Sequence, residues 1–346
     1  MLADMSDSLF LRACRREPVP TVPVWIMRQA GRYMPAYRAL RAKHSFWEMC
    51  KTPELAVEVT LQPVNGIGVD AAILFSDILV PVEAMGVGIE FTEGRGPVIE
   101  KPIRTGADLD TLHIIDAEEV SFVYDAIRIL RGELAGRVPL IGFSGAPYTL
   151  ASYIVEGGGS RNYTHIKTMM YKEPALYDRL LNMLADVVIV YLTAQVKAGA
   201  QAIQMFESWA SSVSPYDYRT RVAPYSRKVL AALAGLGVPV IHFANGAGNF
   251  LGDVAATGAD VVGVDWRVDL DDAWTEIGCD KGIQGNLDPI VLLGGQDEIE
   301  RRVTDILVRA DGRPGHIFNL GHGILPETPV ENAKYLVDCV HRLSTK

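Results

Sequence analysis

The sequence predicts an α/β protein, specifically a (β/α)₈ TIM barrel that forms a single domain over residues 1–346. Eight short apolar runs alternate with longer segments whose apolar residues recur at helical spacing. Near-continuous apolar strands indicate a parallel sheet buried on both faces. A chain of 346 residues holds eight such units, although its length alone also suits two smaller domains. The predicted strands are residues 22–27, 71–75, 139–143, 202–206, 239–243, 261–264, 282–284 and 316–320.

Several helices between these runs have recognisable starts. Pro53 and Pro174 each stand in the first turn of an amphipathic segment, where proline is tolerated because its missing N–H would have no helical partner. Thr52 is the candidate N-cap before Pro53. The helix that begins at Pro174 is predicted to run to about Lys197. Further helices are predicted over residues 121–134, 222–234 and 328–343.

One segment departs from the strand–helix alternation. Residues 86–100 alternate apolar and polar side chains on either side of a glycine-rich turn, which is typical of a β-hairpin. The segment follows the second predicted strand. We therefore expect a β-hairpin insertion after strand 2 of the barrel.

Charge balance and cysteine usage limit the expected partners and compartment. The net charge is −9 with no basic tract, which argues against nucleic acid as a partner. The four cysteines lie far apart, so reduced thiols in the cytoplasm are the simplest account. The N-terminus does not resemble a signal peptide. The most apolar helical stretch, residues 184–192, is too short to span a bilayer and carries Asp186. We expect a cytoplasmic protein without a membrane partner.

Polar side chains follow every predicted strand. In a (β/α)₈ barrel the carboxyl ends of the strands meet at one face, where the chemistry of such proteins is found. We therefore expect these side chains to share one cleft. In chain order they are Arg28 and Arg32, Ser76 and Asp77, Ser144 with Tyr148 and Tyr153, Glu207 with Ser208 and Trp209, Asn245, Asp265 with Trp266, Asn286 with Asp288, and His322.

Each candidate has an ordinary structural alternative that the residues alone leave open. Arg28 and Arg32 offer rigid forks of donors that match a carboxylate, but two arginines also form surface salt bridges that contribute little. Asp77 is equally suited to cap a helix, and Tyr153 to pack in the core. His322 stands between two glycines, which remove side-chain packing around it and permit tight turns.

Several kinds of site are excluded by their missing motifs. Ser208 lacks a G-x-S-x-G elbow, the glycine-rich loop at residues 157–159 lacks the P-loop pattern, and no G-x-G-x-x-G follows the first strand. The histidines show no H-x-H or H-E-x-x-H spacing, so we expect no metal. The residues alone therefore indicate a metal-free site for a polyanionic ligand.

Longer motifs resemble one known family. Residues 23–35 (P-V-W-I-M-R-Q-A-G-R-Y-M-P) and 142–153 (G-F-S-G-A-P-Y-T-L-A-S-Y) resemble the two signatures of the uroporphyrinogen decarboxylases. Residues 75–79, 284–289 and 319–323 also match, and the resemblance covers nearly the whole chain. It implies a homodimeric (β/α)₈ enzyme of porphyrin biosynthesis. This enzyme removes CO₂ from the four acetate side chains of uroporphyrinogen III, giving coproporphyrinogen III, without cofactor or metal.

The resemblance also implies roles for individual residues. Asp77 matches the central aspartate that accepts hydrogen bonds from the pyrrole N–H groups and stabilises the cationic ring formed on protonation. We expect nearby arginines to hold the pKa of Asp77 down. Arg28 is a candidate proton donor besides binding substrate. The other implied substrate-binding positions are Gln29, Ala30 and Gly31 through their backbone, Arg32, Phe46, Tyr153, Ser208 and His322.

Two other functions stay open. A corrinoid-linked methyltransferase on the same barrel would bind zinc through a His-x-Cys pair, whereas the comparable strand end here reads His242-Phe243-Ala244. A non-catalytic tetrapyrrole-binding protein would keep the fold and lose turnover.

Overall fold

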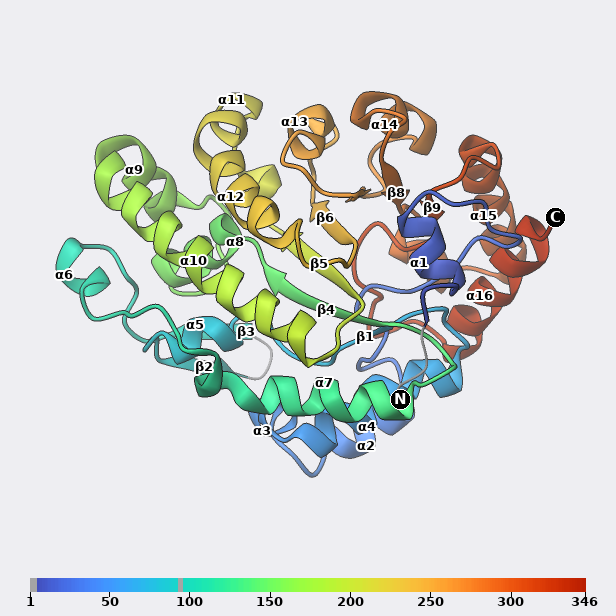
Figure 1. The fold of residues 1–346 in the computed structure, drawn as a ribbon, viewed down its shortest axis with the longest axis horizontal. Coiled ribbons are helices and arrows are strands. Elements are labelled where there is room, and N and C mark those ends of the chain that lie inside the picture. Colours follow the sequence, from blue (N-terminus) through green and yellow to red (C-terminus); the bar gives the residue numbers. More distant parts are fainter. Residues whose placement is uncertain (1–4, 93–95) are drawn as a thin grey trace.

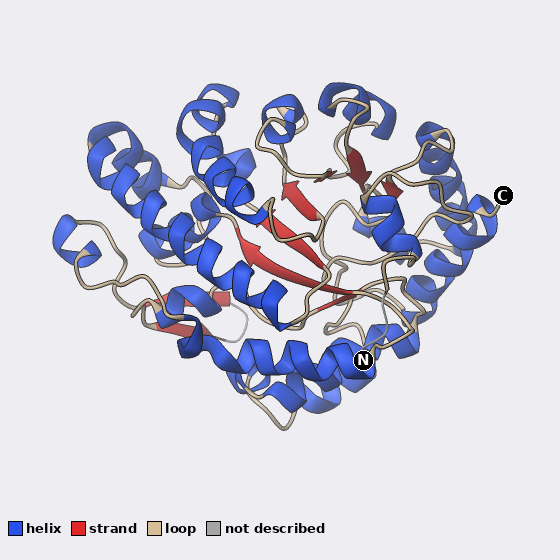
Figure 2. Cartoon of the chain, viewed as in Figure 1, coloured by secondary structure: helices blue, strands red, loops and turns tan. Residues whose placement is uncertain are grey.

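A computed structural model describes residues 5–92 and 96–346. A curled, parallel seven-stranded sheet with order β1-β4-β5-β6-β7-β8-β9 forms the centre, and helices lie around its outside (Figures 1 and 2). This arrangement confirms the predicted TIM-barrel class. The strands of the sheet are β1 Ala72–Ile73, β4 Leu140–Gly145, β5 Ala202–Glu207, β6 Val240–Ala244, β7 Val261–Gly263, β8 Gly282–Gln284 and β9 His316–Ile317.

The predicted first strand, residues 22–27, is not a regular strand. Only Val24 pairs in a ladder, as an isolated parallel bridge to Phe318 just after β9. On its other side Val24 O accepts a hydrogen bond from Asp70 N at 2.7 Å, two residues before β1. Val24 N donates to the Asp70 carboxylate at 2.7 Å. The segment therefore lies between β9 and β1 and completes the ring with few backbone bonds.

The predicted hairpin is present. Strands β2 (Ile89–Thr92) and β3 (Gly96–Ile99) pair antiparallel with Ile89 opposite Ile99, after β1, which is the second predicted strand. The predicted turn at residues 93–95 lies outside the described residues. The Trp47 indole donates to Ile89 O at 3.3 Å, which joins the hairpin to helix α3, Phe46–Lys51.

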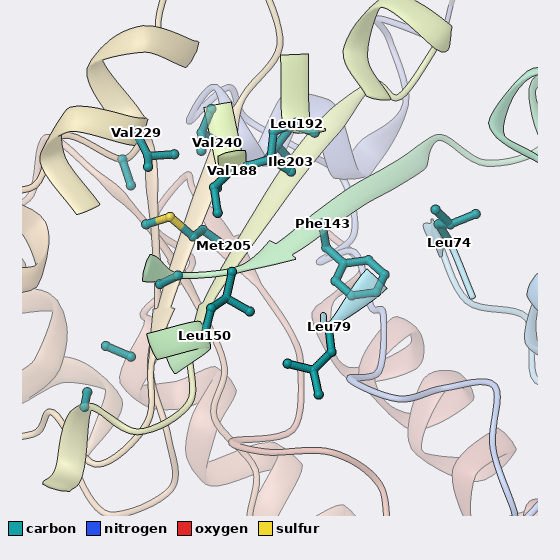
Figure 3. Close-up of a cluster of buried hydrophobic side chains, with 14 of the residues drawn as sticks. Leu74, Leu79, Phe143, Leu150, Val188, Leu192, Ile203, Met205, Val229 and Val240 are labelled. Atoms are coloured by element: carbon teal, nitrogen blue, oxygen red, sulfur yellow. The ribbon is translucent and has the colours of Figure 1, made fainter. Parts of the chain in front are cut away.

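The hydrophobic core lies mainly between the outer face of the sheet and the helices. Val188 and Leu192 of one helix, Val229 of another, Ile203 of β5 and Val240 of β6 lie together in Figure 3 and are almost completely buried. Burying one such side chain contributes about 1.5–3 kcal/mol. The helices are α1 Leu9–Cys14, α2 Pro35–Arg41, α3 Phe46–Lys51, α4 Pro53–Gly66, α5 Val80–Ala84, α6 Gly106–Leu109, α7 Ser121–Glu133, α8 Pro147–Glu156, α9 Thr164–Lys172, α10 Pro174–Ala198, α11 Pro215–Asp217, α12 Ala223–Leu233, α13 Leu251–Ala255, α14 Leu270–Ile277, α15 Gln296–Ala310 and α16 Val330–Ser344.

Two helix predictions need correction. Thr52 ends α3 and precedes α4, but its side chain makes no capping hydrogen bond. The apolar stretch at residues 184–192 belongs to α10, which has 25 residues and is long and apolar enough to cross a membrane by length and composition alone. Half of its most apolar window is buried in the protein. It also packs on α7, α8, α12 and β4, as the core helix of a barrel does.

The barrel interior is closed at one end and polar in its middle. Helix α1 packs Phe10 and Cys14 in one cluster with Trp25 and the inward-facing residues of the strands. Above it, the Trp25 indole donates to Gln284 Oε1 at 2.9 Å, and Gln284 Nε2 donates to Gln204 Oε1 at 3.4 Å. The interior is thus filled by side chains, which leaves the carboxyl ends of the strands for a site.

Candidate active site

The turn after the first predicted strand is held by the Gln29 side chain. Gln29 Oε1 accepts a hydrogen bond from Ile26 N at 3.1 Å, and Nε2 donates to Ala71 O at 3.1 Å. Gln29 N donates to Ile26 O at 2.8 Å, and the Tyr33 hydroxyl donates to Gln29 O at 2.7 Å. Gln29 is completely buried. The backbone N–H and the side-chain amide of Gln29 already make hydrogen bonds within the turn. Substrate could bind either group only by replacing one of these bonds.

Arg28 projects outward from this turn. It is exposed and has a φ of +61°, in the left-handed region that side-chain-bearing residues seldom adopt. Its side chain lies against Gly323, where a Cβ atom would collide with Cγ, Cδ and Nε of Arg28. Ile324 N donates to Met27 O at 2.9 Å. The loop that carries His322 is therefore seated directly against the arginine turn.

Asp77 lies after β1, at the turn that leads into α5. Its Oδ1 accepts a hydrogen bond from Leu79 N at 2.8 Å, which holds the turn before α5, but the N-cap of that helix is Leu79 and has no side-chain capping bond. The carboxylate is only partly exposed. Burial raises the pKa of Asp77 to about 6, while the Leu79 hydrogen bond and the charge of Arg28 act in the opposite direction. The expectation that arginines hold this pKa down was wrong, because desolvation outweighs the charge of Arg28.

The charge of Arg28 acts on both Tyr153 and His322, and that of Asp77 acts on Tyr153. Burial raises the pKa of Tyr153 to about 12; the charge of Asp77 adds to this shift and Arg28 opposes it. Burial lowers the pKa of His322 to about 4, with further lowering by Arg28 and Arg267. At neutral pH His322 is therefore an uncharged imidazole, and Tyr153 a hydroxyl donor. Four predicted residues from four strand ends are thus brought together.

An aromatic cluster adjoins the Asp77 turn. The half-buried Phe46 ring lies 4.8 Å from Phe91 and 5.9 Å from Phe75, centroid to centroid. Phe75 stands two residues before Asp77. Trp47 contacts Phe91 at 4.9 Å. The hairpin and helix α3 therefore build an apolar wall next to the turn that carries Asp77.

Three of the remaining predicted positions follow Arg28 in the same turn, and the fourth, Ser208, follows β5. Arg32 is exposed, and its carbonyl accepts from Arg38 Nη1 at 2.8 Å. Ala30 and Gly31 are half-buried in the turn between the two arginines. Ser208 follows β5 and is half-buried, with its carbonyl accepting from Asn245 Nδ2 at 3.2 Å.

One charged group beside His322 was not singled out from the sequence. Arg267 stacks on the Trp266 ring, with its guanidinium carbon 4.0 Å from the ring centroid. Its Nη1 lies 3.2 Å from Asp265 Oδ2 and donates to Asn245 Oδ1 at 3.3 Å. Its position directly after the Asp265-Trp266 pair was the available signal.

Comparison with known proteins decides the family. The sequence model described as Uroporphyrinogen decarboxylase (URO-D) matches residues 5–343. A protein of Carboxydothermus hydrogenoformans named uroporphyrinogen decarboxylase is 59% identical over 342 residues, covering 99% of this chain and 97% of that protein. One of Syntrophotalea carbinolica with the same name is 57% identical, covering 98% of each chain. The chain belongs to the uroporphyrinogen decarboxylase family.

Solved structures of other proteins share the barrel with this family member. A methyltransferase from Methanosarcina mazei superposes with a TM-score of 0.79 at 24% identity, covering 97% of this chain and 98% of that one. A B12-independent methionine synthase from Shewanella reaches 0.54 at 11% identity. These likenesses show the fold alone.

The strand end that was compared with a zinc-binding His-x-Cys pair reads His242-Phe243-Ala244 in this uroporphyrinogen decarboxylase family member and has no thiol. His242 is fully buried, with Nδ1 3.0 Å from Thr257 Oγ1. Burial lowers its pKa to about 3. Its neighbours in β6, Ile241 and Phe243, pack in the cluster of the barrel interior, so His242 points toward the helices. Among residues 5–92 and 96–346, no group of three or more His, Cys, Asp or Glu is placed to hold a metal.

Proposed function

We propose that this chain is a uroporphyrinogen decarboxylase, which converts uroporphyrinogen III to coproporphyrinogen III with release of four CO₂. The observation that carries the proposal is a poorly solvated Asp77 carboxylate within the field of Arg28, on a chain of this family. Four converging pyrrole N–H groups would match a single carboxylate. Acetate and propionate groups would match exposed arginines.

The proposed chemistry needs an electron sink. Protonation of a pyrrole ring gives a cation, and the electron pair of the breaking C–CO₂⁻ bond then flows into that ring as CO₂ leaves. Protonation of the resulting methylene carbon gives a methyl group, and loss of the ring proton restores the pyrrole. Each acetate therefore consumes one proton and releases one CO₂. Asp77 stabilises the cation, and its poor solvation strengthens this interaction.

Other residues are assigned to binding and positioning. Arg28 and Arg32 bind acidic side chains, and Arg28 also pairs with the leaving carboxylate as the candidate proton donor. Neutral His322 and Tyr153 donate hydrogen bonds to carboxylates. The other proposed contacts are Gln29, Ala30, Gly31, Phe46 and Ser208. We further propose that residues 1–346 work as one domain in a cytoplasmic homodimer without cofactor.

Anaerobic incubation of the metal-stripped protein with uroporphyrinogen III tests the proposal. Stepwise formation of seven-, six-, five- and four-carboxylate products, separated after oxidation, is expected. Binding without turnover would identify a tetrapyrrole-binding protein. Absence of both would favour the methyltransferase alternative and bound zinc. Among variants, Asp77→Ala should lose nearly all activity and Asp77→Glu should keep some, whereas Tyr153→Phe and His322→Asn should be partly active.

A further inference from the structure

The loop that carries His322 contacts two arginine-bearing segments. A Cβ atom on Gly323 would collide with the side chain of Arg28. A Cβ atom on Gly321 would collide with the backbone of Asp265 and Trp266. Each glycine thus permits the close approach of one segment. Because Arg267 follows Trp266 directly, the loop that carries His322 contacts Arg28 through Gly323 and the segment of Arg267 through Gly321, and both charges lower the pKa of His322.

Arg267 is held in place by groups that use only part of its guanidinium. Stacking on Trp266 orients the plane of the guanidinium. Its backbone N–H donates to Asp265 Oδ1 at 2.8 Å, and the buried Asp265 carboxylate also accepts from Gly246 N. Within residues 5–92 and 96–346, the guanidinium makes its hydrogen bond and ion pair through Nη1. The N–H groups on Nε and Nη2 therefore remain for another acceptor.

The exposure of Arg267 suits a ligand. Its side chain is 51% exposed, while that of Asp265 is only 3% exposed. If Arg267 served only to neutralise Asp265, a buried guanidinium would give a stronger ion pair, because exposed ion pairs contribute little to stability. Stacking on Trp266 limits the rotamer entropy that such a side chain would lose on binding, so less free energy is lost when it meets a carboxylate.

We propose that Arg267, which like Arg28 lies near the His322 loop, binds one acidic side chain of the tetrapyrrole and thereby helps to select polycarboxylate substrates. The proposal rests on the proposed function. Arg267 is a specificity-determining residue in this view, and the bond-breaking step stays with Asp77. A carboxylate that bridges Nε and Nη2 would make the bidentate contact that arginine favours.

Arg267→Gln tests the proposal, with Arg302→Gln as the matched control. Arg302 is similarly exposed and pairs with Glu298 on α15, so both variants remove one surface positive charge. KM for uroporphyrinogen III should rise about tenfold in Arg267→Gln while kcat changes less than twofold, as expected for loss of one carboxylate contact. Arg267→Lys should show an intermediate KM, because lysine keeps the charge and loses the fork. Arg302→Gln should match the parent.

Three outcomes would overturn the proposal. Equal KM values for Arg267→Gln and Arg302→Gln, with an active parent, would refute the contact alone. A fall in kcat with a lower urea midpoint and an unchanged KM would assign Arg267 a structural role through Asp265. An inactive parent that does not bind uroporphyrinogen would refute the proposed function itself, and the contact with it.

Discussion

Replacing Asp77 with asparagine is expected to stabilise the fold while removing the proposed activity. Burial raises the pKa of this carboxyl to about 6 from its ordinary 3.8. The folded chain therefore binds the proton more tightly than the unfolded chain, and ionisation of Asp77 opposes folding. Asparagine carries no charge but keeps an oxygen that accepts the hydrogen bond from Leu79 N.

The sign and size of this effect follow from the two pKa values. The destabilisation is absent below pH 3.8, grows as the pH rises, and is complete above about pH 6. A shift of this size corresponds to about 3 kcal/mol at pH 8 and to about 1.6 kcal/mol at pH 5. Because Asp77 is partly exposed, solvent screening reduces both values. We expect Asp77→Asn to gain about 1–3 kcal/mol at pH 8 and about half of that at pH 5.

Urea unfolding of the parent and the variant at both pH values measures this gain, and anaerobic turnover of uroporphyrinogen measures the loss of activity. Asp108→Asn is the control. Hydrogen bonds from the Arg104 and Thr105 backbone N–H groups help to hold the pKa of Asp108 below its usual value, so that variant should lose stability by a similar amount at pH 5 and 8. If Asp77→Asn is less stable than the parent at pH 8, or gains the same stability at both pH values, ionisation of Asp77 does not oppose folding.

Three further predictions concern the same structure. The value of kcat/KM should fall about tenfold from pH 7 to pH 5, because the ionised fraction of a carboxyl group with a pKa of about 6 falls by that factor. A flat pH profile would exclude the ionised Asp77 carboxylate as the form required for activity. Gly323→Ala should displace Arg28 and lower kcat/KM at least about tenfold, whereas Gly132→Ala, where a Cβ atom meets open space, should leave it unchanged. His341 is bonded to the Asp70 carboxylate, and this bond raises the pKa of His341. The variant His341→Gln removes the charged imidazolium from the pair. The loss of stability against urea in this variant should be larger at pH 6 than at pH 9. A histidine whose pKa is raised in the folded state stabilises the fold below its unfolded pKa, and this contribution is lost above its folded pKa.

The positions of the strands were predictable because their apolar runs are buried on both faces, but their ends were not. The runs at 202–206 and 282–284 are regular strand throughout, but of the run at 71–75 only Ala72–Ile73 is strand. The run at 22–27 is equally apolar and forms one bridge. Periodicity reports burial, and Trp25 and Ile26 are indeed completely buried. Whether a buried segment bonds through its backbone or through side chains is decided by residues far away in sequence, such as Asn319, whose Oδ1 accepts from Met27 N at 2.9 Å.

The candidate site was predictable in its location and less so in its electrostatics. The rule that strand ends converge brought Arg28, Asp77, Tyr153 and His322 together from four separate runs. The direction of the Asp77 pKa shift required knowing how much water the fold removes, and no sequence pattern reports that. Arg267 was not singled out because its approach to His322 depends on the tertiary contact of Gly321 with Asp265 and Trp266.

The irregular first strand has a mechanical reason that links the fold to the site. A regular strand would alternate its side chains between the interior and the helices, and would continue the ladder beyond Val24. Side-chain amides instead satisfy the next backbone groups: Gln29 accepts from Ile26 N, and Asn319 from Met27 N. The chain is thereby free to turn at Arg28 with a positive φ and to aim the guanidinium over Gly323. Buried amides that replace a β-ladder thus hold a strained arginine on a rigid base, which is the placement that binding of a carboxylate at a fixed distance requires.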